Sequence, residues 1–206
     1  MKTALRRPLA RGLLALAIAG GGGAPLAAQS AGSGGHPPFT EADVHFMTGM
    51  IAHHAQALLM AGWAPGHGAS PAVQVLCERI VVGQGDEIVL MQRWLGDRNQ
   101  PVPDAGASHA MMPGMDMHQG MPGMLSSEQL MQLDAARGPE FDRLFLTFMI
   151  QHHEGAIVMV DRLFGQGAGE EERSFRFASD VYADQTTEID RMQKMLAALP
   201  PAGGNQ

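Results

Sequence analysis

The chain has 206 residues, a formal net charge of −7 and a single cysteine, Cys77. This acidic balance argues against binding to nucleic acid or to an anionic membrane surface, because both attract basic proteins. One cysteine excludes a disulfide within the chain, so stability must come from packing, and the length suits one domain. We expect Cys77 to be a core residue first and an auxiliary soft ligand second.

Residues 1–28 show the order of features of a cleavable secretory signal. Four basic residues come first, an apolar run over 13–18 follows, and small residues lead to Ala28. The apolar run is too short for a permanent membrane anchor. Cleavage after Ala28 removes four positive charges and no acidic residue, so the net charge moves from −7 to −11. We therefore expect a periplasmic or secreted protein that begins with a flexible lead-in over 29–38.

The first predicted helix covers residues 40–63 and the second covers 70–95, where a Ser-Pro pair is a strong start signal. The turn between them contains His67, which we expect to be exposed. Together they predict a helical hairpin over 39–97.

Residues 98–125 are predicted to form a long linker, because Gly, Pro and Met dominate and no helical or strand period survives. An apolar flap would gain more from Leu or Phe, so we expect the linker donors to converge on a soft ion. These accessory candidates are His109, Met111, Met112, Met115, Met117, His118, Met121 and Met124.

The second hairpin is predicted over residues 126–199. A short helix over 126–137 precedes a Gly-Pro break, and a long helix follows over 139–164. The last helix covers 170–199, and residues 200–206 form a tail.

The two hairpins carry the same motif. MIAHHAQALLM at residues 50–60 matches MIQHHEGAIVM at 149–159, 99 positions later. A second shared element, Q-x-x-E-I-x-x-M, follows each copy, here at an offset of 101. A duplicated hairpin predicts an all-α, antiparallel four-helix bundle of the ferritin-like kind.

The Met and His side chains of each motif fall on one broad helix face, because a helix advances about 100° per residue. A lone buried histidine is usually a hydrogen-bonded core residue, but paired imidazoles on a methionine-bearing face, repeated in a second copy, favour a metal site. Thioethers and imidazoles suit copper outside the cytoplasm, where thiols are oxidised. The candidate ligands are Met50, His53, His54, Met60, Met149, His152, His153 and Met159.

Further residues are expected to support these ligands. If the first hairpin is antiparallel about His67, Ile80 lies level with His54, and Glu87 lies further along the same face. The groups expected to orient the imidazoles are Gln84, Glu87, Gln185 and Glu188. The accessory methionines within the helices are Met47, Met91 and Met192.

The strings FMTGMIAHHAQALLM and FLTFMIQHHEGAIVM, each followed by Q-x-x-E-I-x-x-M, resemble the bacterial CopM-like family, a ferritin-like domain of unknown function. The resemblance covers residues 39–199. It implies an exported protein that binds copper, and silver as a second soft ion, for metal tolerance or homeostasis. A copper exporter or another periplasmic copper carrier is the protein partner implied. The match of the two copies does not extend to Met47, where the second copy has Leu146.

Two alternatives stay open. A di-iron oxidase on the same bundle would use Glu87 and Glu188, but it also needs a Glu-x-x-His motif on two helices, and the sequence contains none. A metal-free structural bundle would use the histidines only as hydrogen-bond partners of the two glutamates. No nucleophile elbow or phosphate-binding loop occurs, so we expect a binding protein and not an enzyme.

Overall fold

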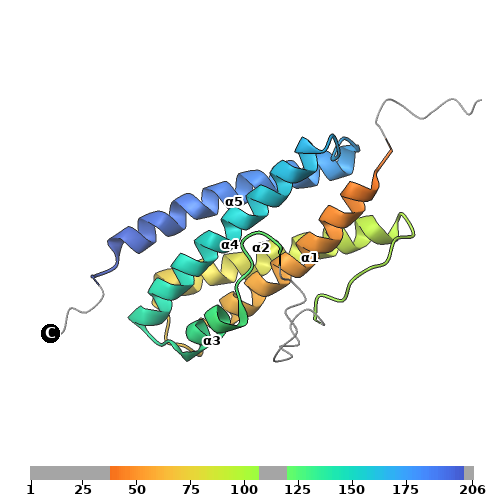
Figure 1. The fold of residues 1–206 in the computed structure, drawn as a ribbon. Coiled ribbons are helices and arrows are strands. Elements are labelled where there is room, and N and C mark those ends of the chain that lie inside the picture. Colours follow the sequence, from red (N-terminus) through yellow and green to blue (C-terminus); the bar gives the residue numbers. More distant parts are fainter. Residues whose placement is uncertain (1–37, 107–119, 202–206) are drawn as a thin grey trace, which may run out of the picture. The chain divides into compact units, whose positions relative to one another are not determined.

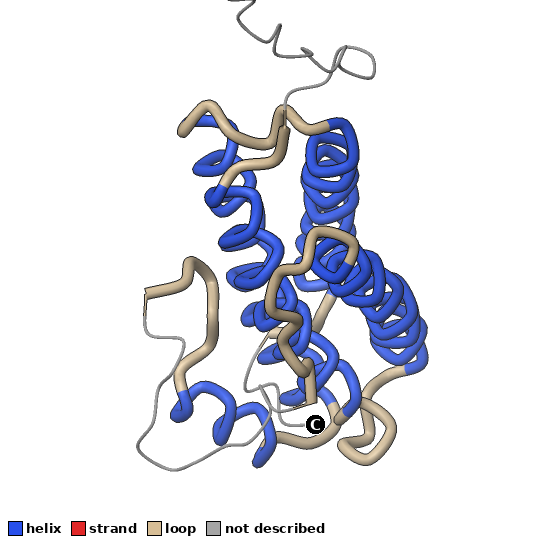
Figure 2. The backbone as a smooth tube through the Cα atoms, turned by 90° about the vertical axis from the view of Figure 1, so that its right-hand side faces the viewer, coloured by secondary structure: helices blue, strands red, loops and turns tan. Residues whose placement is uncertain are grey.

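The computed structural model describes residues 38–106 and 120–201. The described part is all-helical, which confirms the predicted fold class (Figures 1 and 2). Each helix begins and ends within two residues of its prediction. The helices are α1 (Glu41–Gly62), α2 (Pro71–Gly96), α3 (Ser127–Ala135), α4 (Pro139–Gly165) and α5 (Glu172–Ala198). The predicted signal, almost all of the lead-in and the end of the tail lie outside the described residues.

Local sequence sets the helix starts. Thr40 and Asp43 form a capping box at α1, in which each side chain binds the backbone N–H of the other residue. Ser126 and Gln129 form the same box at α3. At α2, Ser70 takes the N-cap position, but its side chain makes no capping hydrogen bond. The prolines that open α2 and α4 lack an N–H where none is needed.

The helices pack as two hairpins joined through their first helices. Helix α1 packs along α2, α4 packs along α5, the hairpins meet where α1 contacts α4, and α3 rests on α4 (Figure 1). Two buried apolar clusters fill the interior. Among the described helices, none is long and apolar enough to cross a bilayer.

Two buried aspartates fasten each hairpin to the turn of the other. Asp142 in α4 accepts a hydrogen bond from the N–H of Ser70 at 3.1 Å, just before α2. Asp43 in α1 accepts one from the N–H of Gly169 at 3.0 Å, just before α5, and one from the Ser174 hydroxyl at 2.6 Å. Ser70 and Gly169 are separated by the same 99 positions as the two aspartates. The duplication therefore includes the contacts that join its copies, and these contacts make α1 and α4 antiparallel.

Replacing Asp43 with asparagine is expected to lower the free energy of unfolding by about 1–3 kcal/mol near neutral pH, because charged hydrogen bonds are lost. Burial raises the pKa of Asp43, but hydrogen bonds from Ser174, Thr40 and Gly169 outweigh it and hold the pKa below the usual 3.8. The ionised carboxylate therefore stabilises the fold above pH 3.8, and this contribution disappears as the pH falls through the lower folded pKa. Urea denaturation of the Asp43→Asn variant and the unmodified protein, at neutral pH and at a pH below 3.8, measures this contribution to the free energy of unfolding. The exposed Asp161 is the control, since Asp161→Asn should change stability by less than about 0.5 kcal/mol.

His67 is buried, so the expectation of an exposed turn histidine is wrong. The residue is 8% exposed. Its Nδ1 lies 2.8 Å from the Trp63 carbonyl oxygen, and its Nε2 lies 2.9 Å from Asp134 at the end of α3. Its own carbonyl accepts from the N–H of Gly138 at 2.8 Å. The short helix α3 covers this turn, which counting along α1 and α2 does not reveal.

Candidate metal centre

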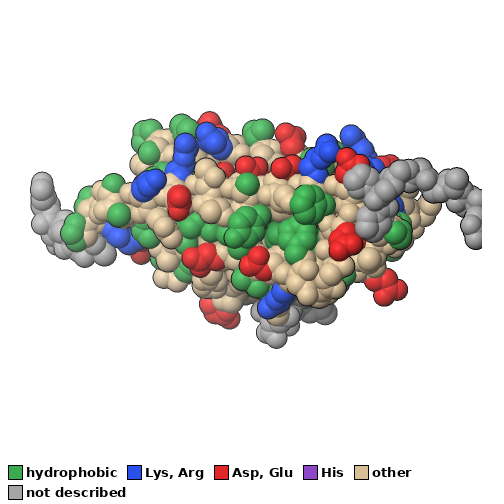
Figure 3. All heavy atoms as spheres, turned by 90° about the horizontal axis from the view of Figure 1, so that it is seen from above, with side chains coloured by type: hydrophobic (Ala, Val, Ile, Leu, Met, Phe, Trp, Pro, Cys, Tyr) green, Lys and Arg blue, Asp and Glu red, His purple; other side chains and the backbone are tan. Residues whose placement is uncertain are grey.

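Four histidines form a buried row where α1 meets α4. The rings of His53 and His152 lie 3.8 Å apart between centroids. His54 lies 6.4 Å from His53, and His153 lies 6.2 Å from His152. Each of the four is at most 1% exposed. No described histidine is visible on the face drawn in Figure 3. The two copies of the motif therefore meet at their imidazoles, with the approximate two-fold symmetry of the duplication.

A carboxylate from the second helix of each hairpin lies against each outer histidine. Glu87 Oε2 is 2.6 Å from His54 Nε2, and Glu188 Oε2 is 2.8 Å from His153 Nε2. The contact of Glu188 with His153 has the geometry of a hydrogen bond, whereas that of Glu87 with His54 is close without hydrogen-bond geometry. A carboxylate that accepts from Nε2 holds the proton there and leaves the lone pair on Nδ1. Within the described chain, the Nδ1 atoms of His54 and His153 are buried without a hydrogen-bond partner. This is the arrangement in which an imidazole binds a metal ion.

Counting residues from the turn at His67 places Ile80 level with His54. In the structure the His54 ring instead contacts Glu87, which lies seven residues further along α2. Helix side chains lean toward the N-terminus of their own helix. In an antiparallel pair the two leans point toward each other, so His54 meets a residue about two turns beyond Ile80.

His152 is held in its neutral form. Burial and the imidazoles of His53, His153 and His54 hold the pKa of His152 well below its usual 6.5. Neither of its ring nitrogens makes a hydrogen bond of normal geometry within the described residues. His53 instead donates from Nε2 to the Pro122 carbonyl at 3.1 Å. Neutral imidazole is the form that binds metal, so burial keeps this ring ready for it.

The methionines lie in the two apolar clusters, and each cluster receives thioethers from both hairpins. Because α1 and α4 are antiparallel, the first methionine of each motif lies in the same cluster as the last methionine of the other motif. The equivalent sets are Met50, Met91 and Met159 in one cluster, and Met149, Met192 and Met60 in the other. Met47 joins the first set, and Cys77 packs in the second cluster. Burial raises the pKa of the Cys77 thiol to about 12, so it stays protonated as a core residue.

The end of the linker, segment 121–125, lies across α1 and α4 beside the histidine row (Figure 1). The Gln56 side chain accepts from the Leu125 N–H at 2.8 Å and donates to its carbonyl at 3.2 Å. Position 155 is the equivalent of position 56, and there a glycine lets the segment touch the α4 backbone. A Cβ on Gly155 would lie 2.2 Å from the Pro122 carbonyl oxygen.

This segment brings one predicted linker donor to the motif. A Cβ on Gly49 would lie 3.6 Å from the Met121 sulfur and 3.4 Å from the Met159 methyl carbon, so these two methionines are neighbours. Met124 is partly buried in the same segment. The other linker candidates, His109, Met111, Met112, Met115, Met117 and His118, lie outside the described residues.

The donor set fits a soft ion. In the described ranges, no three His, Cys, Asp or Glu side chains gather closely enough to hold a metal ion by themselves. A carboxylate-bridged di-iron centre requires such a group, whereas a copper site can be completed by thioethers. The buried Nδ1 atoms of His54 and His153, with the thioethers of the flanking methionines, could hold a soft metal ion here.

Removing the carboxylates of Glu87 and Glu188 tests whether they orient the imidazoles of His54 and His153 for metal binding. For a metal ion held by these imidazoles, the double variant Glu87→Gln and Glu188→Gln is expected to weaken binding by about 10- to 100-fold, because the imidazoles lose basicity and a fixed tautomer. Competition with a chromophoric copper chelator measures the affinity. Asp86→Asn, which changes an exposed carboxylate on the same α2 helix, is the control and should change little.

A known protein family matches this chain over most of the helical bundle. The profile of a domain of unknown function, DUF305, matches residues 43–196. The chain belongs to the DUF305 family. A DUF305 fragment from Deinococcus radiodurans is 29% identical with a TM-score of 0.67, and the alignment covers 79% of this chain and 100% of that chain. A DUF305 candidate secreted protein from Streptomyces coelicolor is 25% identical with a TM-score of 0.66, covering 80% and 98%.

This DUF305 chain is also similar to CopM, which confirms the resemblance seen in the sequence. The Cu(II)-bound form of CopM is 30% identical with a TM-score of 0.61, and the alignment covers 75% of this chain and 95% of that chain. Further CopM structures contain Cu(I) or silver. No protein of curated function matches the chain.

Proposed function

We propose that this DUF305 protein is an exported copper-binding protein that sequesters or carries Cu(I) and Cu(II), and also Ag(I), for metal tolerance or homeostasis. The observation that carries the proposal is the buried row of four imidazoles between two equivalent methionine sets. CopM, a relative at 30% identity, has been crystallised with Cu(II). In this proposal the protein binds copper as cargo, whether to sequester it or to carry it, and catalyses no reaction.

Each part of the centre has a distinct task in this proposal. The eight motif residues supply nitrogen and sulfur donors, and Glu87 and Glu188 orient two of the imidazoles. Neutral imidazole accepts either copper oxidation state, while thioether sulfur favours Cu(I) without forming disulfides. Met121 adds a donor from the linker beside Met159. A copper exporter or another periplasmic carrier is the partner with which such a protein would exchange copper.

Export is part of the same proposal. The order of basic, apolar and small residues over 1–28 supports a cleavable signal. The similar Streptomyces coelicolor protein is described as a candidate secreted protein. An exported location explains the choice of methionine over cysteine as the soft donor.

Titration of the mature protein with Cu(I), Cu(II), Fe(II) and Zn(II) tests the proposal. The expected result is that copper binds more tightly than iron or zinc. Among the described residues, no three His, Cys, Asp or Glu side chains gather as a di-iron centre requires, and thioethers flank the row. Binding of iron more tightly than copper would support the di-iron alternative. Failure to bind any of these ions would support a metal-free bundle, in which the histidines serve only as partners of Glu87 and Glu188.

A further inference from the structure

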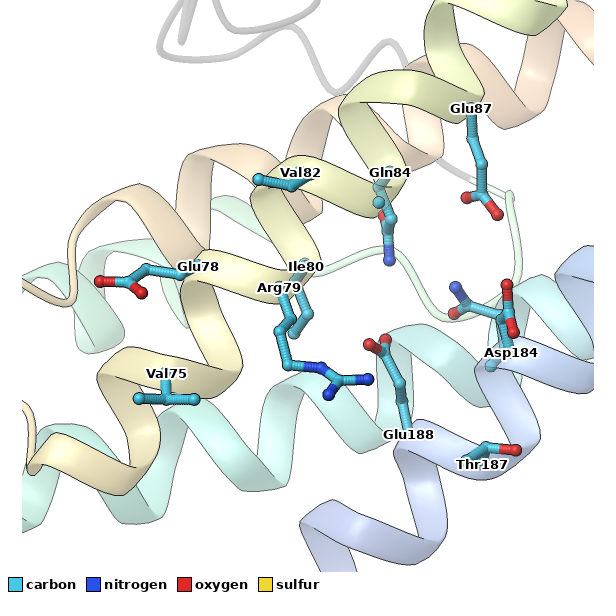
Figure 4. A pocket seen from close by; sticks show the side chains of 12 residues that line it. Val75, Glu78, Arg79, Ile80, Val82, Gln84, Glu87, Asp184, Thr187 and Glu188 are labelled. Atoms are coloured by element: carbon cyan, nitrogen blue, oxygen red, sulfur yellow. The ribbon is translucent and has the colours of Figure 1, made fainter.

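A groove of about 540 Å³ lies between α2 and α5, on the side of the bundle away from the contact of α1 with α4. Its walls carry four carboxylates and one guanidinium, that of Arg79. Figure 4 shows Gln84 and Glu87 of α2 facing Asp184 and Glu188 of α5 across it. The groove is thus an acidic hollow between two helices of the bundle.

Two amides at the base of the groove are unsatisfied. Gln84 is 3% exposed and Gln185 is 2% exposed, and both line the groove. Both amide atoms of Gln84 and the Oε1 of Gln185 lack a hydrogen-bond partner among the described residues. Buried amides are normally paired, because an unpaired one costs about 1–3 kcal/mol. The two glutamines hold the same position in the two copies of Q-x-x-E-I-x-x-M, so the unpaired amides are a repeated feature of the fold.

The groove leads to the histidine row. The side chains of Glu87 and Glu188 are 16% and 20% exposed, and each lies against an imidazole that is fully buried. Burial, and then the nearby carboxylates of Glu87 and Glu188, raise the pKa of Asp184. Beyond the groove, the ends of α2 and α5 are tied together, since the Trp94 indole N–H donates to Glu171 at 3.0 Å.

We propose that this groove is the entrance by which hydrated divalent copper reaches the histidine row. Asp184, Glu87 and Glu188 attract the ion, and the amides of Gln84 and Gln185 replace part of its water shell before the imidazoles take it. Oxygen donors suit the harder Cu(II) ion at this stage. This inference rests on the proposed copper-binding function, and it assigns a route to that function.

Adjacent threonines on α5 give a matched pair for testing the entrance. Thr187 lines the groove and Thr186 does not, although both hydroxyls donate to a carbonyl one turn back and both side chains are exposed. Stopped-flow tryptophan quenching would measure the association rate of Cu(II) with the whole protein at low ionic strength. Thr187→Lys is expected to slow association by about three- to tenfold and Thr186→Lys by less than about twofold. Added salt should reduce the difference.

A second pair of variants removes a negative charge, where the threonine pair adds a positive one. Asp184→Asn is expected to slow association more than Asp190→Asn, which makes the same change outside the groove. If the two variants of each pair slowed Cu(II) association equally while still binding copper, the groove would not be the entrance, but the proposed copper-binding function would stand. Absence of copper binding to the unmodified protein would overturn both.

Discussion

Replacing His53 and His152 together with alanine is expected to weaken Cu(I) binding by more than about 100-fold, since the loss of ligands should exceed the effect of losing their supporting groups. These two rings lie 3.8 Å apart at the centre of the row, where they join the two copies of the motif. Helix content should stay nearly unchanged, because neither side chain is needed to close a helix end. Chelator competition and circular dichroism measure the two quantities.

His45→Ala is the matched control for this double variant. His45 lies on α1 about two turns before His53, and its side chain is exposed. Its replacement should leave copper affinity within about twofold, as expected for a surface change. The opposite pattern, in which the His53 and His152 double variant loses helix content but keeps its affinity, would show that the central histidines are core residues and not ligands.

Replacing Gly155 with alanine is expected to lower the free energy of unfolding by about 2–3 kcal/mol, because the site is overpacked by backbone. The added Cβ would lie 2.2 Å from the Pro122 oxygen and 2.5 Å from the Gly123 Cα, and neither atom belongs to a flexible side chain. Segment 121–125 must then leave α4, and the hydrogen bond from His53 to Pro122 is lost with it. Urea denaturation measures the change in stability.

Gly83→Ala is the control for the glycine variant. A Cβ on Gly83 would meet nothing within 4 Å, and the residue lies in the middle of α2. Alanine there should stabilise the helix by about 0.5–1 kcal/mol, since it restricts the unfolded chain. If both glycine variants were equally stable, segment 121–125 would not be held against α4 as the structure shows.

The helices and their pairing were predictable because strong local signals mark the helix ends and the motif occurs twice. The capping box at Thr40 and the prolines that begin α2 and α4 act within one turn, so their effect can be predicted from neighbouring residues. The repeated His pairs indicated two equivalent helices with an inward imidazole face. Their meeting at 3.8 Å depends on how the hairpins pack, which local signals do not determine.

The contacts that could not be predicted from the sequence join residues far apart in the chain. Asp43 binds the N–H of Gly169, 126 positions away, and His67 binds Asp134, 67 positions away. Both depend on which turn each hairpin presents to the other. The shared interval of 99 between the two aspartates, and between Ser70 and Gly169, was a signal that could have found the first of them.

The docking of segment 121–125 left a different signal, in the places where the two motifs disagree. Gln56 in the first copy corresponds to Gly155 in the second, and Ala52 corresponds to Gln151. Gln56, Gly155 and Gln151 all contact the segment. One segment crosses two related helices, so the helices cannot present it with identical surfaces. Departures from an internal repeat therefore mark where an unrepeated part of the chain lies.

X-ray absorption at the copper edge, on protein loaded with copper during export to the periplasm, tests the central claim most directly. If the imidazole row and its methionine sets form the copper site, the spectrum will show both sulfur and imidazole nitrogen bound to copper. A copper shell made only of oxygen, or copper that stays bound with an unchanged spectrum when His53 and His152 are removed, would contradict it.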